Sequence, residues 1–323
     1  DGHVRNTTLN TDVGGDDKTN YGFTVLWEPN DDFDLKVHHE IMEDNSEQGA
    51  YTNRNVVGEL ACTITQIGFD PANGCEKDAN DGPDTTESDG SNFSNNDYET
   101  TIVTANFNTE AFLYTYIYSL RDMDEQNMQD FDGAPAHLLR MNFFNDWEQT
   151  SHEFRVTSQF SDTVQFIAGF YDWEADFEQR WDVYDLFYQL SRLGVPPWGA
   201  GRQGVEGYSD VFPWEDDVAG NNGQSQVTTS TAVFFSADWF VADNWTLTAG
   251  FRWTEEEKDF VGGASAPGYY PLRGEPWPGI FNPYEAKAKW TETTPKLGLR
   301  YQPSDDAMFY ASYSEGFKSG GFF

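Results

Sequence analysis

Histidine is the residue whose chemistry is easiest to weigh here, because only five histidines occur among 323 residues. His38 and His39 are adjacent in one strand-like run, and His152 adjoins Glu153 in another. Neighbouring side chains on a strand point to opposite faces, so neither pair is placed to hold one metal ion or share one proton. A G-x-S-x-G elbow is absent, and the 55 acidic residues are too numerous for any one pair to indicate catalysis. We therefore predict no catalytic residue, resident metal or cofactor.

The two cysteines, Cys62 and Cys75, lie in one polar segment over residues 43–97. No paired cysteine or histidine accompanies them, which favours a disulfide over a metal site. A disulfide in turn indicates an oxidising compartment outside the cytoplasm.

Acidic residues outnumber basic ones by 55 to 19, for a formal net charge of −36. Binding to a phosphate backbone needs clustered Lys and Arg, so this composition argues against nucleic acid as a partner. Three interpretations of the acidic surface stay open. It is a solvated surface suited to a saline habitat, it recruits divalent cations that bridge lipopolysaccharide, or it favours a neutral or cationic ligand over an anionic one.

Residues 228–256 show which elements must carry these groups. Apolar side chains alternate with small or polar ones before and after a break at 242–244, which predicts two antiparallel strands joined as a hairpin. Each strand is about ten residues or longer, the length of a tilted strand that crosses a bilayer. An aromatic content of 16% fits a strand surface that faces lipid.

The same pattern recurs along the chain. Four further hairpins are predicted, and their short turns are centred on residues 29–32, 108–110, 161–163 and 303–306. Between the hairpins we predict an intermediate loop over 122–146 and long loops over 43–97, 175–227 and 257–290. Short turns at one end and long loops at the other are typical of outer-membrane barrels. The alternative, a soluble β-sandwich, gives no reason for loop lengths to segregate in this way.

Several stretches then resemble the barrel of TonB-dependent outer-membrane receptors. They are TPKLGLRY at 294–301, FYASYSEGFKSGGF at 309–322, LTAGFRWT at 247–254, SHEFRVTS at 151–158 and GHVRN at 2–6. The resemblance implies an all-β, antiparallel transmembrane β-barrel of about 22 strands with a plugged lumen, in the outer membrane of a Gram-negative bacterium. Residues 1–323 would form a partial barrel domain of about 10–11 strands, with the plug and the box that engages TonB upstream and the closing strands downstream.

The function implied by the resemblance is energised import of a scarce ligand, a ferric siderophore by default, with a glycan or cobalamin as alternatives. The expected partners are outer-membrane lipid and lipopolysaccharide, the TonB energy-coupling complex through the N-terminal region, and a small-molecule or metal-chelate ligand. A passive porin-like channel or an adhesin is the runner-up. A barrel enzyme is the third interpretation, and it would need a histidine paired in the lumen or at the rim.

Two groups of side chains are candidates for binding. Charged residues expected to face the lumen could contact the plug, or they could merely solvate a watery interior: Arg121, Glu153, Arg155, Arg252 and Arg300. Aromatic residues of the long loops could stack on a ligand, or they could pack among the loops themselves: Tyr188, Trp198, Tyr208, Trp214 and Trp277.

Overall fold

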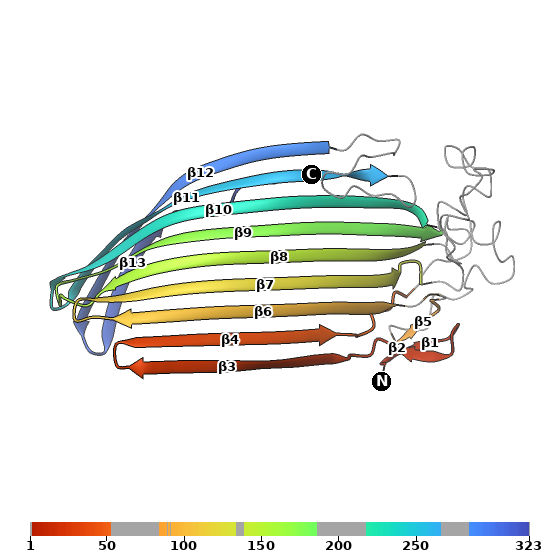
Figure 1. Ribbon diagram of the computed structural model, residues 1–323, viewed down its shortest axis with the longest axis horizontal. Coiled ribbons are helices and arrows are strands. Elements are labelled where there is room, and N and C mark those ends of the chain that lie inside the picture. Colours follow the sequence, from red (N-terminus) through yellow and green to blue (C-terminus); the bar gives the residue numbers. More distant parts are fainter. Residues whose placement is uncertain are drawn as a thin grey trace.

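The computed structural model describes residues 2–52, 84–88, 90, 92–133, 139–185, 218–265 and 284–322. Its main element is a ten-stranded antiparallel sheet in the order β13-β12-β11-β10-β9-β8-β7-β6-β4-β3 (Figure 1). Each strand of this sheet therefore pairs with the sheet's next strand along the chain. The strands are β3 (Lys18–Asn30), β4 (Phe33–Asp44), β6 (Phe93–Asn108), β7 (Phe112–Asp130), β8 (Leu139–Ser158), β9 (Val164–Asp185), β10 (Val218–Ala242), β11 (Trp245–Ser265), β12 (Tyr284–Ser304) and β13 (Ala307–Ser314).

All five predicted hairpins are present, and their turns lie together at one end of the sheet (Figure 1). Asp31 and Asp32 separate β3 from β4, and Asp243 and Asn244 separate β10 from β11. Asn30 Oδ1 accepts a hydrogen bond from the backbone N–H of Asp32 at 3.0 Å, which is the local bonding expected of an Asn-Asp turn. The predicted short turns at one end of the sheet are therefore confirmed.

The strand expected at residues 2–6 forms, but it does not belong to the large sheet. β1 (Val4–Asn6) pairs antiparallel with β2 (Thr11–Val13) and parallel with β5 (Thr85–Thr86) in a separate three-stranded sheet. The buried Asn6 side chain holds this unit together, because its Nδ2 donates to the backbone carbonyl of Ser88 at 2.8 Å. The partial eleventh strand is therefore not part of the large sheet.

The strands are longer than predicted, so the predicted loops are too wide. β8 has 20 residues, β9 has 22 and β10 has 25, whereas a tilted strand needs about 9–11 residues to cross a bilayer. The intermediate loop predicted at 122–146 is mostly strand, because β7 continues to Asp130 and β8 begins at Leu139. The long loops at 43–97, 175–227 and 257–290 are likewise strand at their edges. We name the parts of the strands beyond the membrane-crossing length the strand extensions.

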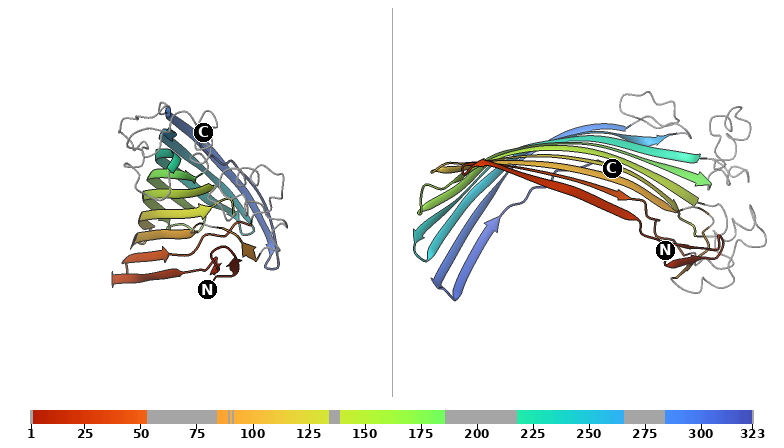
Figure 2. Two further views of the ribbon diagram at one scale, coloured as in Figure 1. Left: turned by 90° about the vertical axis from the view of Figure 1, so that its right-hand side faces the viewer. Right: turned by 60° about the horizontal axis from the view of Figure 1, so that its bottom comes forward.

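The large sheet is curved (Figure 2), and its two faces carry different kinds of side chain. One face exposes large apolar side chains, and we name it the outer face. Phe154, Phe170 and Phe235 lie on it, and Phe235 is 37% exposed. On the opposite, inner face, polar and charged side chains predominate, and Ala232 is fully buried. A water-soluble protein would bury such a broad apolar surface, so this face requires an apolar surrounding. No helix among the described residues is long and apolar enough to cross a membrane.

Candidate functional site

The five charged residues predicted to face the lumen all lie on the inner face. Strand register establishes this, because each falls on the parity opposite to the apolar residues of its own strand. Glu153 and Arg155 on β8 form an ion pair with each other. Arg252 on β11 approaches this pair through Tyr171, because its guanidinium lies over the Tyr171 ring and Tyr171 pairs in register with Glu153.

Aromatic rings hold Arg252 in this cluster. Its guanidinium carbon lies 5.5 Å from the ring centroid of Tyr171 and 5.8 Å from that of Phe234, and its Nε donates to Thr254 Oγ1 at 3.1 Å. A guanidinium over a ring face is stabilised by the ring quadrupole. Gly169 leaves room for Phe234, because a Cβ on Gly169 would come within 2.3 Å of the Phe234 ring. The cluster is therefore a fixed group of charges rather than a set of loose surface side chains.

Arg121 and Arg300 share the inner face but stand apart from this cluster. Arg121 pairs in register with Gln149, four residues along β8 from Glu153, or roughly 13 Å at 3.3 Å per residue. Arg300 lies near the turn end, where its Nη2 donates to Thr246 Oγ1 at 2.9 Å. The structure thus brings together three of the five predicted residues.

The remaining predicted site residues lie outside the described residues. They are the disulfide candidates Cys62 and Cys75 and the loop aromatics Tyr188, Trp198, Tyr208, Trp214 and Trp277. Their roles stay predictions.

Sequence reasoning missed a pattern on the inner face of the strand extensions. Three cross-strand pairs follow one another along β8 and β9: Trp147 with Phe177, Asn145 with Gln179, and Phe143 with Trp181. The ring centroids are 5.6 Å apart in the first pair and 6.4 Å apart, nearly parallel at 20°, in the third. An amide pair therefore lies between two aromatic pairs.

The amides belong to a row of hydrogen bonds that crosses five strands. Gln224 Nε2 donates to Gln179 Oε1 at 2.8 Å, and Gln179 Nε2 donates to Asn145 Oδ1 at 2.8 Å. Asn145 Nδ2 then donates to Glu125 Oε2 at 2.9 Å, and Tyr98 Oη donates to Glu125 Oε1 at 2.5 Å. We name this series, from Tyr98 to Gln224, the amide row.

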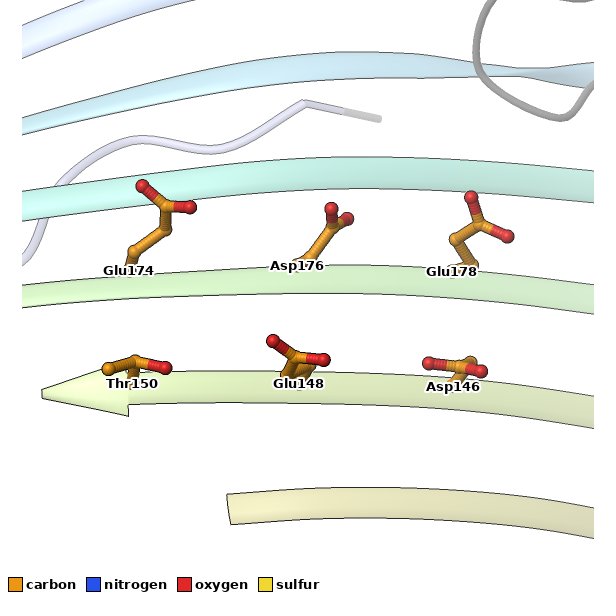
Figure 3. Close-up of a pocket in the computed structure, with 6 residues that line it drawn as sticks. All are labelled: Asp146, Glu148, Thr150, Glu174, Asp176 and Glu178. Atoms are coloured by element: carbon orange, nitrogen blue, oxygen red, sulfur yellow. The ribbon is translucent and has the colours of Figure 1, made fainter. Parts of the chain in front are cut away.

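The outer face of the same strand extensions is acidic. Asp146 and Glu148 on β8 face Glu178 and Asp176 on β9, and with Thr150 and Glu174 they line a shallow polar depression of about 290 Å³ (Figure 3). Asp122 and Asp124 on β7 continue the same rows. We name this group of outer-face carboxylates on β7–β9 the acidic belt.

Like charges in the acidic belt affect one another. The belt lies beyond the apolar part of the outer face, and so outside the membrane-spanning part of these strands. Partial burial, and then the negative charges of Asp122 and Asp124 with those of Asp176 and Glu148, raise the pKa of Asp146 above its ordinary value. On β11 and β12 the charge is balanced instead, because Lys287 Nζ lies 2.7 Å from Glu257 Oε1 and Lys289 pairs with Glu255.

A signal for both patterns is present in the sequence. Residues 143–148 read Phe-Phe-Asn-Asp-Trp-Glu and residues 176–181 read Asp-Phe-Glu-Gln-Arg-Trp, so acids alternate with rings or amides at the period of a strand. High polarity made both stretches resemble loops. Alternation between acids and rings, and not between polar and apolar residues, is the pattern that identifies them.

A family model described as TonB dependent receptor-like, beta-barrel matches residues 43–323. No curated protein matches the chain in a sequence comparison.

Several solved structures share the fold, and three of them are described here. The ferric yersiniabactin uptake receptor FyuA from Yersinia pestis has a TM-score of 0.63 and 12% identity, over 96% of this chain and 39% of that one. The siderophore receptor PiuA from Acinetobacter baumannii has a TM-score of 0.57 and 11% identity, over 92% and 41%. The ferric-catecholate import receptor Fiu from E. coli K12 has a TM-score of 0.53 and 10% identity, over 97% and 48%. The chain thus spans less than half the length of each matched receptor.

Proposed function

Because this chain belongs to the TonB-dependent receptor β-barrel family, we propose that it forms part of a receptor that imports a scarce ligand with energy from the TonB system. The family places the chain in the outer membrane of a Gram-negative bacterium. The observation that carries the proposal is the family match over 43–323 on a ten-stranded sheet whose outer face is apolar. Its relatives are receptors and transporters, and we assign no reaction to it.

The ligand we propose first is an iron complex of a siderophore. The names of the three receptors compared above refer to siderophores or ferric complexes, which supports this choice. A glycan or cobalamin is the alternative cargo, since a ligand too large for a passive pore is what an energised receptor serves. The loop aromatics Tyr188, Trp198, Tyr208, Trp214 and Trp277 are proposed to contact the ligand.

We propose a separate role in the receptor for each face of the sheet. The inner-face residues Glu153, Arg155 and Arg252, with Arg121 and Arg300 further along the wall, would bond to a plug that fills the lumen. Fixed charges suit this role, because an ion pair or cation–π contact already holds each member of the cluster in place. The TonB complex would act on the plug from the periplasmic side.

The outer face is proposed to meet lipid and lipopolysaccharide. Exposed rings such as Phe170 and Phe235 match acyl chains, as in other barrels. The acidic belt lies just beyond them and would adjoin lipopolysaccharide phosphates. Two negative surfaces repel, so contact there depends on the cations and salt of the medium.

Energy dependence separates this proposal from its runner-up, a passive porin-like channel or adhesin. The experiment compares uptake of radioactive iron, supplied as a siderophore chelate, in cells with and without a working TonB system. Each strain is tested with and without the gene for the full-length receptor. We expect receptor-dependent uptake that disappears when TonB is removed. Receptor-dependent uptake that persists without TonB would overturn active transport in favour of a passive channel.

A further inference from the structure

We propose that the amide row and its flanking ring pairs form a contact surface for an electrically neutral ligand that presents many hydroxyl or carbonyl oxygens. This inference rests on the proposed import function and specifies the class of its cargo. The surface comprises Asn145, Gln179 and Gln224 with the pairs Trp147–Phe177 and Phe143–Trp181.

The amides keep part of their hydrogen-bonding capacity for a ligand. A primary amide has two N–H donors and an oxygen that can accept two hydrogen bonds. Within the row, Asn145 and Gln179 each use one N–H donor and one acceptor position. Each amide therefore keeps a second N–H donor and a second acceptor position for a ligand. Gln224 donates to Gln179, and its own oxygen accepts nothing within the row.

Glu125 sets the direction of the row. A carboxylate only accepts, so the side chains that bond to it, Tyr98 and Asn145, must both donate. Asn145 then offers its oxygen to Gln179, and Gln179 offers its oxygen to Gln224. Hydrogen bonds that end on a charge are stronger and polarise the chain behind them. The amides are therefore oriented before any ligand arrives, which lowers the entropic cost of binding.

The rings on either side supply the apolar part of the surface. Residues two apart on a strand are roughly 7 Å apart, so a ring pair lies about this distance above and below the Asn145–Gln179 pair. Ligand sites combine aromatic surface with a few placed polar groups in this way. All four rings are partly exposed on the inner face, which in this family faces the lumen.

Charge restricts the class of ligand. The amide row and its ring pairs contain no Lys or Arg, and Glu125 is their one charged side chain. With a chain charge of −36, the field around this wall is negative and opposes the approach of an anion. Two sources offer the required chemistry: a neutral iron(III) trihydroxamate chelate and a free neutral oligosaccharide.

The test is calorimetric titration of the full-length receptor in detergent with three probes. They are a neutral iron(III) trihydroxamate, a neutral glucose oligosaccharide and an anionic iron(III) tris-catecholate. We expect one neutral probe to bind and the anionic probe to bind at least tenfold more weakly. The neutral probe that binds identifies the source. Failure of both neutral probes to bind, or preference for the anionic probe, would overturn the proposal.

Matched variants locate the binding on the wall. Gln179→Leu keeps the approximate size of the side chain and removes its hydrogen bonds, so we expect the Kd to rise on the order of tenfold. Gln165→Leu is the control, because Gln165 lies on the same strand and face near the turn end. Heat-modifiable gel mobility verifies that both variants fold. Equal affinity of the Gln179 variant and the control would refute the surface.

This outcome is separable from that of the import function, because binding in detergent needs no energy source. Normal TonB-dependent uptake together with unchanged affinity in Gln179→Leu would overturn the proposed contact surface and still support the import function. Loss of affinity in Gln179→Leu together with TonB-independent uptake would support the contact surface and overturn the energised import function.

Discussion

At the scale of single residues, the outer face of β7–β9 concentrates like charges, whereas the inner face of β8 pairs opposite ones. Asp146 faces Glu178 across β8 and β9 and has Asp124 on its other side. On the inner face, Glu153 and Arg155 neutralise each other only a few residues away. Alternation along β8 produces the contrast, because neighbouring residues point to opposite faces.

Neutralising Asp146 should stabilise the receptor at neutral pH. A raised folded-state pKa means that ionising this carboxyl costs free energy in the folded protein. The cost is present at pH 7 and disappears as the pH falls through the raised folded pKa and below the ordinary value of 3.8. Asp146 is only partly buried, so water screens the repulsion and we expect Asp146→Asn to gain about 0.2–1 kcal/mol.

The measurement is the thermal unfolding midpoint of the full-length receptor in detergent, at pH 7 and at pH 3. The midpoint of Asp146→Asn should exceed that of the wild type at pH 7, and the two should converge at pH 3. Asp162→Asn in the exposed β8–β9 turn is the control and should change neither value. A lower midpoint for Asp146→Asn at pH 7 would contradict the assigned repulsion.

At the scale of elements, each long strand combines two environments along its length. The turn-side half of β10 carries apolar residues on its outer face, with Phe235 between Val233 and Ala237. The same strand continues for many residues beyond the membrane-crossing length, where Gln224 enters the amide row. One strand thus contributes to the lipid-facing wall at one end and to a polar surface at the other.

The two faces of β10 should respond oppositely to a new charge. Phe235→Arg places a cation on the lipid side near the middle of the apolar run, where about 2–4 kcal/mol of folding free energy is lost. Ser236→Arg places the same side chain on the inner face and should cost clearly less. Urea titration of full-length receptor folding into lipid vesicles measures both. A cost for Ser236→Arg equal to or above that for Phe235→Arg would reverse the assignment of faces.

At the scale of the whole molecule, the described sheet is open. β3 and β13 each pair with a single strand of the large sheet, so both edges of that sheet carry unpaired backbone groups. A bilayer core offers no water to satisfy such groups, so membrane sheets close into barrels. The matched receptors are more than twice as long as this chain, which leaves ample length for strands that close the wall.

Residues 1–323 expressed alone should therefore fail to form a barrel. We expect no heat-modifiable gel mobility after refolding into detergent or vesicles, whereas the full-length receptor should show it. Protease digestion should degrade the isolated segment and spare the membrane-embedded wall of the full-length protein. A heat-modifiable, protease-resistant species from residues 1–323 would show that this sheet closes by itself.

The sequence alone determined the local order of this wall. Period-two alternation and turn chemistry placed five hairpins, and they placed Arg155 and Arg252 on the inner face, because these signals act between neighbouring residues. Tertiary structure decided how far the strands run. The extensions at Phe143–Trp147 and Phe177–Trp181 are stabilised by cross-strand pairing, which overrides their polar, loop-like composition. It also decided that β1 joins a separate small sheet, and that Tyr98, Glu125, Asn145, Gln179 and Gln224 meet in one row. The hydrogen bonds of the row join residues 20 to 45 positions apart, and register between strands, not local pattern, brings them together.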